Sequence, residues 1–223
     1  MNEGIKMSTF IRSKSKKDFV YDHLKKKIIT NQLKPLEPLN EAALATELRV
    51  SKTPIREALH QLEKDALIDN IPQKGWFVSE INIKDIRELF EVRELIECSA
   101  IKMAISKADN DRFIMLRKKL SEITNGKIPS NLLTSGELVH TTIIESLENR
   151  RLYEMYQSLM EHYSRTRIYF VHQFNEARLN NAFTEHKEIL DAIIAKDATT
   201  AEELMRKHLY NGFSNIKKLS MDF

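Results

Sequence analysis

Over most of the chain, apolar and polar residues recur with a helical period, and the pattern is clearest between residues 39 and 67. Two amphipathic stretches are separated there by a break at Arg49 and Val50. Asn40 precedes the first stretch and Ser51 the second, and the side chains of both residue types cap helices. The pattern predicts two helices joined by a tight turn. The residues expected to face the neighbouring helices are Ala43, Leu44, Leu48, Ile55, Ala58, Leu59, Leu62 and Ala66.

Shorter patterns flank this helix pair. Residues 18–31 predict a helix that packs behind the pair through Phe19, Val20, Leu24 and Ile28. Residues 33–39 contain two prolines and predict an extended link. Two β-prone runs, residues 67–71 and 76–81, flank Pro72-Gln73-Lys74-Gly75, which indicates a hairpin with a basic tip.

From Ile83 onward the pattern is helical almost throughout. A first long helix begins at Ile83, and five more are predicted at residues 109–123, 132–147, 152–174, 177–194 and 199–219. Thr199 or Thr200 is the expected cap of the last. The predicted fold is mainly α, with three helices and a small β-hairpin followed by an all-α bundle of about six helices with an internal cavity. We divide the chain into a basic arm (1–17), a first domain (18–81) and a helical domain (82–223).

The charge distribution supports a nucleic-acid partner for the first domain. The chain has 223 residues and a net charge of +3, but residues 1–78 hold 14 Lys and Arg against 10 Asp and Glu. The remainder holds 21 against 22, so the basic excess lies in the first domain, as phosphate binding requires. The arm is either a contact to the DNA backbone or a solvated terminus. With one cysteine, no long apolar run and no apolar signal core, we expect a soluble cytoplasmic protein without a membrane span.

The start of the second helix carries the side chains that suit DNA. Ser51, Lys52, Thr53 and Arg56 can hydrogen-bond phosphates and base edges where a helix-turn-helix places its recognition helix in the major groove. The phrase VSKTPIREAL resembles the recognition-helix signature of the GntR family of bacterial transcription regulators, and residues 40–78 fit its winged helix-turn-helix. Two positions depart from the family pattern: Lys52 stands where arginine is usual, and Ala66 where glycine is common.

This resemblance implies a regulator that binds a double-stranded operator as a homodimer, commonly as a repressor. Lys74 and Gly75, at the tip of the wing, are expected to approach the DNA, although an ordinary turn is the alternative. The phrases DIRELFEVRELIECSAIKMA and EHKEILDAIIAKDATTAEELMRKHL resemble the ligand-binding domain of the FadR-like (FCD) branch of the same family. The helical domain is therefore expected to sense a small molecule.

Three histidines, His140, His186 and His208, lie on three different predicted helices. Taken alone they favour ordinary core or surface groups, but the resemblance implies a metal held by three such histidines and an aspartate. Zinc, nickel and manganese all suit imidazole ligands. The aspartate position holds Gly136. The sequence leaves three possibilities open. Glu137 could replace the missing carboxylate, or water or the effector could complete a site of three histidines. The third possibility is that metal binding has been lost.

A small organic acid is the natural effector of such a site, because its carboxylate can ligate a metal while an arginine pairs with its other end. Arg93 is the main candidate, and Arg165 and Arg167 are alternatives to it. Two rival functions remain for the helical domain: dimerisation alone, or metal-dependent hydrolysis. The chain lacks an HExxH motif, a nucleophile elbow and a phosphate loop, so we predict that it is not an enzyme.

Overall fold

The computed structural model describes residues 15–107, 110–123, 132–170, 173–174 and 176–221. The chain divides into two units, Met1–Glu80 and Ile81–Phe223, and each has its own apolar core. Most of the expected basic arm falls outside the described residues. Lys16 and Lys17 instead begin the first helix, whose cap is a reciprocal pair of hydrogen bonds between Ser15 and Asp18.

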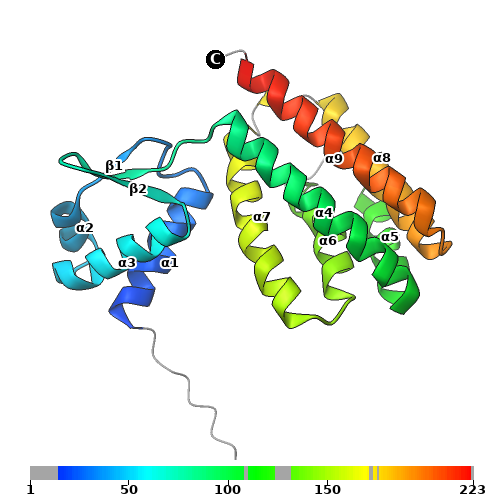
Figure 1. Ribbon diagram of the computed structural model, residues 1–223, viewed down its shortest axis with the longest axis horizontal. Helices are drawn as coiled ribbons and strands as arrows, with labels where there is room; N and C mark the ends of the chain where they lie inside the picture. Colours follow the sequence, from blue (N-terminus) through cyan, green and yellow to red (C-terminus); the bar gives the residue numbers. More distant parts are fainter. Residues whose placement is uncertain (1–14, 108–109, 124–131, 171–172, 175, 222–223) are drawn as a thin grey trace, which may run out of the picture. The chain divides into compact units, whose positions relative to one another are not determined.

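The first unit contains three helices and three short strands, with the small sheet along one side of the helices (Figure 1). In chain order these are α1 (Lys16–Ile29), β1 (Pro38–Leu39), α2 (Glu41–Glu47), α3 (Lys52–Lys64), β2 (Ile68–Ile71) and β3 (Gly75–Val78). Its core joins Val20, Leu24 and Ile28 of α1 to the apolar face of α3. Phe19, which we expected on the same face, is 49% exposed, so that prediction was wrong.

The turn between α2 and α3 forms as the sequence pattern predicts. The Asn40 side chain accepts hydrogen bonds from the backbone N–H groups of Ala42 and Ala43, and Arg49 adopts a φ of 54° that reverses the chain. Ser51 takes the position that precedes α3, but its side chain makes no capping hydrogen bond, so the expected capping was wrong. Ala66 is exposed with a φ of 54° just after α3, and therefore does not face a neighbouring helix.

The strands form an antiparallel sheet in the order β1-β3-β2. The predicted hairpin pairs Ile68 with Val78 and Ile71 with Gly75, and its tip lies between β2 and β3. The third strand was missed by sequence analysis, which made residues 33–39 a plain link. Pro38 and Leu39 pair with β3 instead, so the segment before α2 is tied to the wing.

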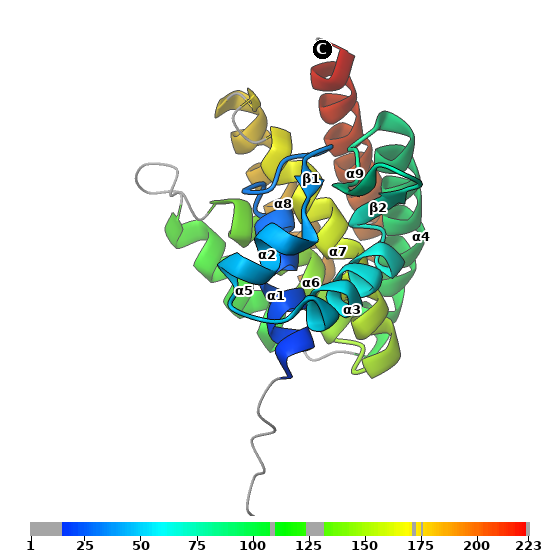
Figure 2. The ribbon, with the colours of Figure 1, turned by 90° about the vertical axis from the view of Figure 1, so that its left-hand side faces the viewer.

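The second unit is built from six helices within the described residues, in agreement with the predicted number. They are α4 (Ile83–Lys107), α5 (Asp111–Ile123), α6 (Leu132–Glu145), α7 (Arg150–Phe170), α8 (Glu176–Ile194) and α9 (Ala198–Met221). Helix α9 packs between α4 and α8, and α4 and α9 are neighbours in both views (Figures 1 and 2). The α9 cap is Asp197, whose carboxylate accepts hydrogen bonds from the backbone N–H and the hydroxyl of Thr200; our assignment of the cap to Thr199 or Thr200 was wrong.

None of the helices in the described part of the chain combines the length and the apolar character that a membrane span requires.

Candidate functional site

The exposed face of α3 carries the residues predicted to contact DNA. Ser51, Lys52, Thr53 and Arg56 are all exposed. The Arg56 side chain is 62% exposed, and its Nε donates a hydrogen bond to Glu41 Oε2 at 2.7 Å. This hydrogen bond lowers the pKa of the Glu41 carboxyl. The ion pair holds the guanidinium in place at the surface while its other nitrogens stay available to a partner.

Helix α3 and the wing enclose one groove of about 560 Å³. Arg56 lines it from the helix, and Lys74 and Gly75 line it from the wing. Gly75 has a φ of 94°, which favours glycine, and a Cβ built on it meets nothing within 4 Å. His60, four residues after Arg56, also lines the groove and packs edge-on against Trp76. Sequence analysis did not single out His60, although its spacing from Arg56 was a signal that it shares the same helix face.

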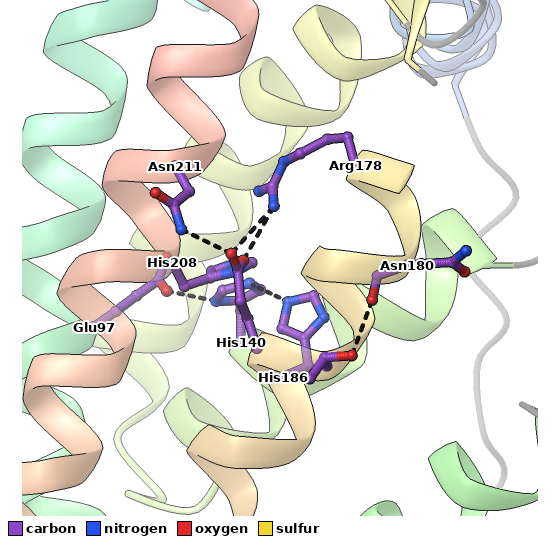
Figure 3. A network of polar contacts seen from close by, with 9 residues as sticks. Glu97, His140, Arg178, Asn180, His186, His208 and Asn211 are labelled. Carbon is purple, nitrogen blue, oxygen red and sulfur yellow. Dashed lines mark hydrogen bonds and ion pairs between the residues drawn. The ribbon is translucent and has the colours of Figure 1, made fainter. Parts of the chain in front are cut away.

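In the second unit, three helices bring the predicted histidines together. His140 of α6, His186 of α8 and His208 of α9 are at most 6% exposed, and each offers a ring nitrogen within 4.8 Å of the others. The Nε2 atoms of His140 and His186 are 3.2 Å apart. Figure 3 shows the three rings turned toward one another, with Glu97, Asn211 and Arg178 around them.

Two carboxylates orient these rings from outside. Glu97 of α4 accepts a hydrogen bond from His140 Nδ1 at 2.5 Å, and Glu185 of α8 accepts one from His208 Nδ1 at 2.7 Å. An ionised carboxylate only accepts, so each Nδ1 carries the proton and each Nε2 is left with its lone pair. That lone pair is the form of imidazole that binds a metal, and a carboxylate on the other nitrogen is the usual support of a metal-bound histidine.

Burial and neighbouring charges determine the protonation of this cluster. Burial lowers the pKa of His186 well below its ordinary value, and it lowers that of His208 to about 4 although Glu185 acts in the opposite direction. Burial alone would raise the pKa of Glu97, but the charge of Arg93 and the hydrogen bonds from His140 and Arg93 hold it far below the usual range. Burial likewise raises the pKa of Glu185, but the hydrogen bonds from His208 and Asn211 and the charge of Arg178 together lower it to about 2.

The histidines form one wall of a cavity of about 90 Å³. Arg93 of α4 lines it and is fully buried. Its Nε donates to Glu97 at 2.7 Å, and its guanidinium lies 4.0 Å from the centre of the Tyr163 ring. Arg93 Nη2 is buried and has no hydrogen-bond partner among the residues that the structure describes. A buried guanidinium nitrogen without a partner is costly, and an anionic ligand in the cavity would satisfy it.

The other predicted residues of the site divide into two groups. Gly136 lines the cavity directly beside His186. Glu137 also lines the cavity, but its carboxylate is held by α7, where it accepts from Arg167 at 2.6 Å and from Ser164 at 2.7 Å. It is not part of the group of potential metal ligands that the three histidines form. Arg167 lines the cavity, whereas Arg165 is buried and is not among the residues that line it.

Sequence analysis missed Glu97, Glu185 and Arg178. The one available signal was on α4, where Arg93 and Glu97 are four residues apart on a face that is otherwise apolar. Glu185 and Arg178, which pair at 3.2 Å, belong to α8 and carry no comparable signal in a chain with 30% charged residues. Arg178 pairs with Glu185 on the same helix, and Glu185 in turn contacts His208 and Asn211 on α9.

Comparisons with known proteins identify a family domain in each of the two units. Residues 88–211 match the FCD domain, and residues 16–78 match the bacterial regulatory proteins of the gntR family. YdhC of Bacillus subtilis, an uncharacterized HTH-type transcriptional regulator, is 29% identical over 204 residues, which cover 88% of this chain and 89% of YdhC. The HTH-type transcriptional repressor GlaR of Escherichia coli is 26% identical over 198 residues, or 85% of this chain and 90% of GlaR. The solved metal-free FCD domain of TM0439 has a TM-score of 0.58 at 22% identity, covering 65% of this chain and all of that one.

A winged helix-turn-helix followed by an all-helical ligand-binding domain defines a DNA-binding transcription regulator. The chain belongs to the GntR family, in the branch that carries an FCD domain. Because its relatives are named as transcription regulators, metal-dependent hydrolysis is not retained as its function.

Proposed function

We propose that this regulator is a cytoplasmic homodimeric repressor that releases its operator when a small carboxylate enters the cavity of the FCD domain. The observation that carries the proposal is the cavity itself, which is lined by three buried histidines and by Arg93, whose buried Nη2 has no hydrogen-bond partner among the described residues. A domain that served dimerisation alone would have no need of buried polar groups around a cavity, because such groups are costly unless a partner satisfies them.

The donor set fits a divalent metal such as zinc, nickel or manganese. His140, His186 and His208 would hold it, and Glu97 and Glu185 would orient two of these rings through their Nδ1 atoms. A bound metal would supply a Lewis-acidic ligand position for a carboxylate oxygen. The TM0439 FCD domain is described as metal-free, which makes metal occupancy the first variable to control in this chain.

The size and charge of the cavity support a small organic acid as the effector. A cavity volume of about 90 Å³ favours a small ligand. Its carboxylate would face the histidines or Arg93, while Phe90 and Tyr163 provide apolar walls. Charge-assisted hydrogen bonds from a guanidinium are well suited to carboxylates.

On the DNA side, Thr53 and Arg56 would contact bases or adjacent phosphates, and Ser51 and Lys52 would position α3 in the major groove. Lys74 and Gly75 would bring the wing against the minor groove or the backbone. A two-fold dimer presents two such helices to a palindromic operator. The dimer would have two states, which differ in how its DNA-binding units are placed. A ligand that binds one state more tightly than the other shifts the population toward that state, and operator affinity changes with it. The name of GlaR, which is a repressor, supports the proposal that this regulator also represses transcription.

The test begins by selecting bound duplexes from random DNA with the purified, untagged protein. Gel-shift titrations of the selected operator are then run with and without zinc, in the presence of acetate, lactate, succinate or citrate. We expect at least one acid to weaken operator binding, and Arg93→Lys, which keeps a positive charge beside Glu97 but removes the Nη2 donor, to reduce that response while operator binding in its absence is retained. Release of DNA by no acid, with or without metal, would contradict the sensor and leave dimerisation as the role of the domain.

A further inference from the structure

Glu41 is the one acidic residue among the described residues that line the groove between α3 and the wing. Arg56 and Lys74 in the same groove suit the phosphates of DNA, whereas a carboxylate is repelled by them. Glu41 lies in the first turn of α2, where an acidic side chain stabilises the helix. Its carboxylate nevertheless binds residues outside α2, so its position in the groove calls for a second explanation.

The two carboxylate oxygens of Glu41 join α2 to α3 and to the wing. Oε2 accepts a hydrogen bond from Arg56 Nε at 2.7 Å, and Oε1 accepts one from Trp76 Nε1 at 3.4 Å. Both partners only donate, so the group between them has to accept on both sides. An ionised carboxylate does so, whereas a glutamine would turn its NH₂ group toward one of the two donors. The charge of Glu41 is therefore matched to both contacts.

The contact with Glu41 determines which edge of the Arg56 guanidinium stays open. A guanidinium has a side edge, which includes Nε, and an end edge, which is formed by its two Nη atoms. Glu41 occupies Nε and with it the side edge. The end edge can still donate two parallel hydrogen bonds, the pattern that matches O6 and N7 of guanine in the major groove. An Arg56 side chain held in this way has fewer orientations in which it can bind a phosphate instead.

Trp76 connects this contact to the wing. Its side chain is buried in β3 and packs edge-on against His60 of α3, with the ring centres 5.0 Å apart. Its backbone pairs with Leu39 of β1, directly before the Asn40 cap of α2. One aromatic residue thus contacts α3, the start of α2 and the Glu41 carboxylate. The direction in which that carboxylate points depends on the wing as well as on α2.

We infer that Glu41 is a positioning residue that determines DNA specificity, because its carboxylate, held by Trp76, directs the two Nη groups of Arg56 toward a guanine of the operator. This inference rests on the proposed function, since it requires that Arg56 contacts DNA. The negative charge of Glu41 lowers the affinity for DNA of any sequence, and its hold on Arg56 raises the discrimination at one base pair. Removing the charge therefore changes these two quantities in opposite directions, which a loss of folding would not do.

The experiment measures gel shifts of the full-length protein at one salt concentration. The duplexes are the selected operator, its single-base-pair variants and an unrelated sequence of the same length. Arg56→Ala is measured first, and the base pair at which it loses discrimination identifies the guanine. Glu41→Gln has nearly the same shape as the parent side chain, and it should lose about tenfold in discrimination at that base pair. Its affinity for the unrelated duplex should rise.

Trp76→Phe tests the link to the wing. The variant keeps an aromatic ring beside His60 but lacks the N–H group that Glu41 accepts. We expect a loss of about threefold in discrimination at the same base pair, since one hydrogen bond between partly exposed groups is removed. Unchanged discrimination in Trp76→Phe would overturn the part of the wing in holding Glu41.

Glu47→Gln is the matched control. Glu47 belongs to the same helix and accepts a hydrogen bond from Lys27 at 2.9 Å, but it does not line the groove. The variant removes the same charge from the first unit without changing the contact of Arg56. We expect the discrimination of the parent at every base pair. Urea unfolding followed by Trp76 fluorescence verifies that the first unit is folded in both glutamine variants.

The remaining outcomes separate this inference from the proposed function. If Glu41→Gln keeps the discrimination of the parent at the base pair found with Arg56→Ala, the inference is overturned. If it binds the operator and the unrelated duplex more weakly by the same factor, Glu41 is merely structural and the inference is overturned as well. Both outcomes leave the DNA contact of Arg56 in place. If Arg56→Ala loses discrimination at no base pair, the proposed role of Arg56 fails, and the inference fails with it.

Discussion

The two functional regions of this chain are built in opposite ways. The DNA-binding face is nearly continuous in the sequence, running from Asn40 to Gly75, and its polar side chains are exposed and weakly held. The cavity of the helical unit is assembled from α4, α6, α7, α8 and α9, and the three histidines and Arg93 that line it are buried. Its other charged side chains are partly buried and joined in ion pairs. We therefore expect substitutions of polar side chains on the DNA-binding face to leave the free energy of unfolding nearly unchanged, and substitutions of the buried polar side chains of the cavity to lower it.

The largest expected effect comes from breaking the buried ion pair on α4. Glu97→Ala leaves the fully buried Arg93 uncompensated and should lower the free energy of unfolding of the second unit by about 3–5 kcal/mol. Urea unfolding followed by far-UV circular dichroism reports mainly these six helices. The single tryptophan, Trp76, belongs to the first unit, so its fluorescence transition should stay in place.

The matched control is Glu91→Ala, which removes an ion pair of the same four-residue spacing on the same helix. Arg87 and Glu91 are both more than half exposed, so the loss should be below about 1 kcal/mol. Similar losses in Glu97→Ala and Glu91→Ala would contradict the contrast between a buried and an exposed network.

An intermediate effect is expected on the DNA-binding face, and there it concerns binding rather than folding. Arg56→Ala should cost about 1–3 kcal/mol of operator binding, because a base or phosphate contact is lost from an exposed helix face. Gel-shift titration measures the loss, and Lys64→Ala, at the far end of the same helix, provides a control for charge alone. Unchanged operator affinity in a folded Arg56→Ala protein would remove the proposed role of this arginine.

The smallest expected effect concerns backbone conformation at Ala66. Its φ of 54° is unfavourable for any residue with a Cβ, so Ala66→Gly should stabilise the first unit by up to about 1 kcal/mol. Trp76 fluorescence during urea unfolding measures this change. Ala58→Gly, within the buried face of α3, should destabilise the same unit instead. A loss of stability in Ala66→Gly would show that the turn does not strain alanine.

Features formed by residues close in the sequence could be predicted, whereas features formed by residues far apart could not. The α2–α3 turn, the Asn40 cap and the hairpin depend on residues within a few positions of one another, and all three formed as expected. Strand β1 was missed because its partner Trp76 is far along the chain, and two residues beside a proline carry no strand pattern of their own. Asp197 displaced the expected threonine cap because it lies one residue before the helix and reaches the free N–H of Thr200.

In the cavity, the family resemblance located the three histidines, which the fold brings within reach of one another. It did not reveal that Glu97 and Glu185 hold the rings of His140 and His208, since the contact between Glu97 and His140 joins α4 to α6. It also did not reveal that a Cβ at position 136 would lie 2.8 Å from His186 Cε1 on another helix, which only the three-dimensional packing shows.

The central claim, that the buried histidines form a metal-dependent sensing site, is tested most directly by the metal content of the untagged protein beside a His186→Ala variant. The protein is reconstituted with zinc, nickel or manganese in the presence of acetate, desalted in acetate-containing buffer, and measured by elemental analysis. Our account predicts close to one metal per chain, lost in His186→Ala while circular dichroism is unchanged. Equal metal content in the two proteins, or none in either, would contradict it.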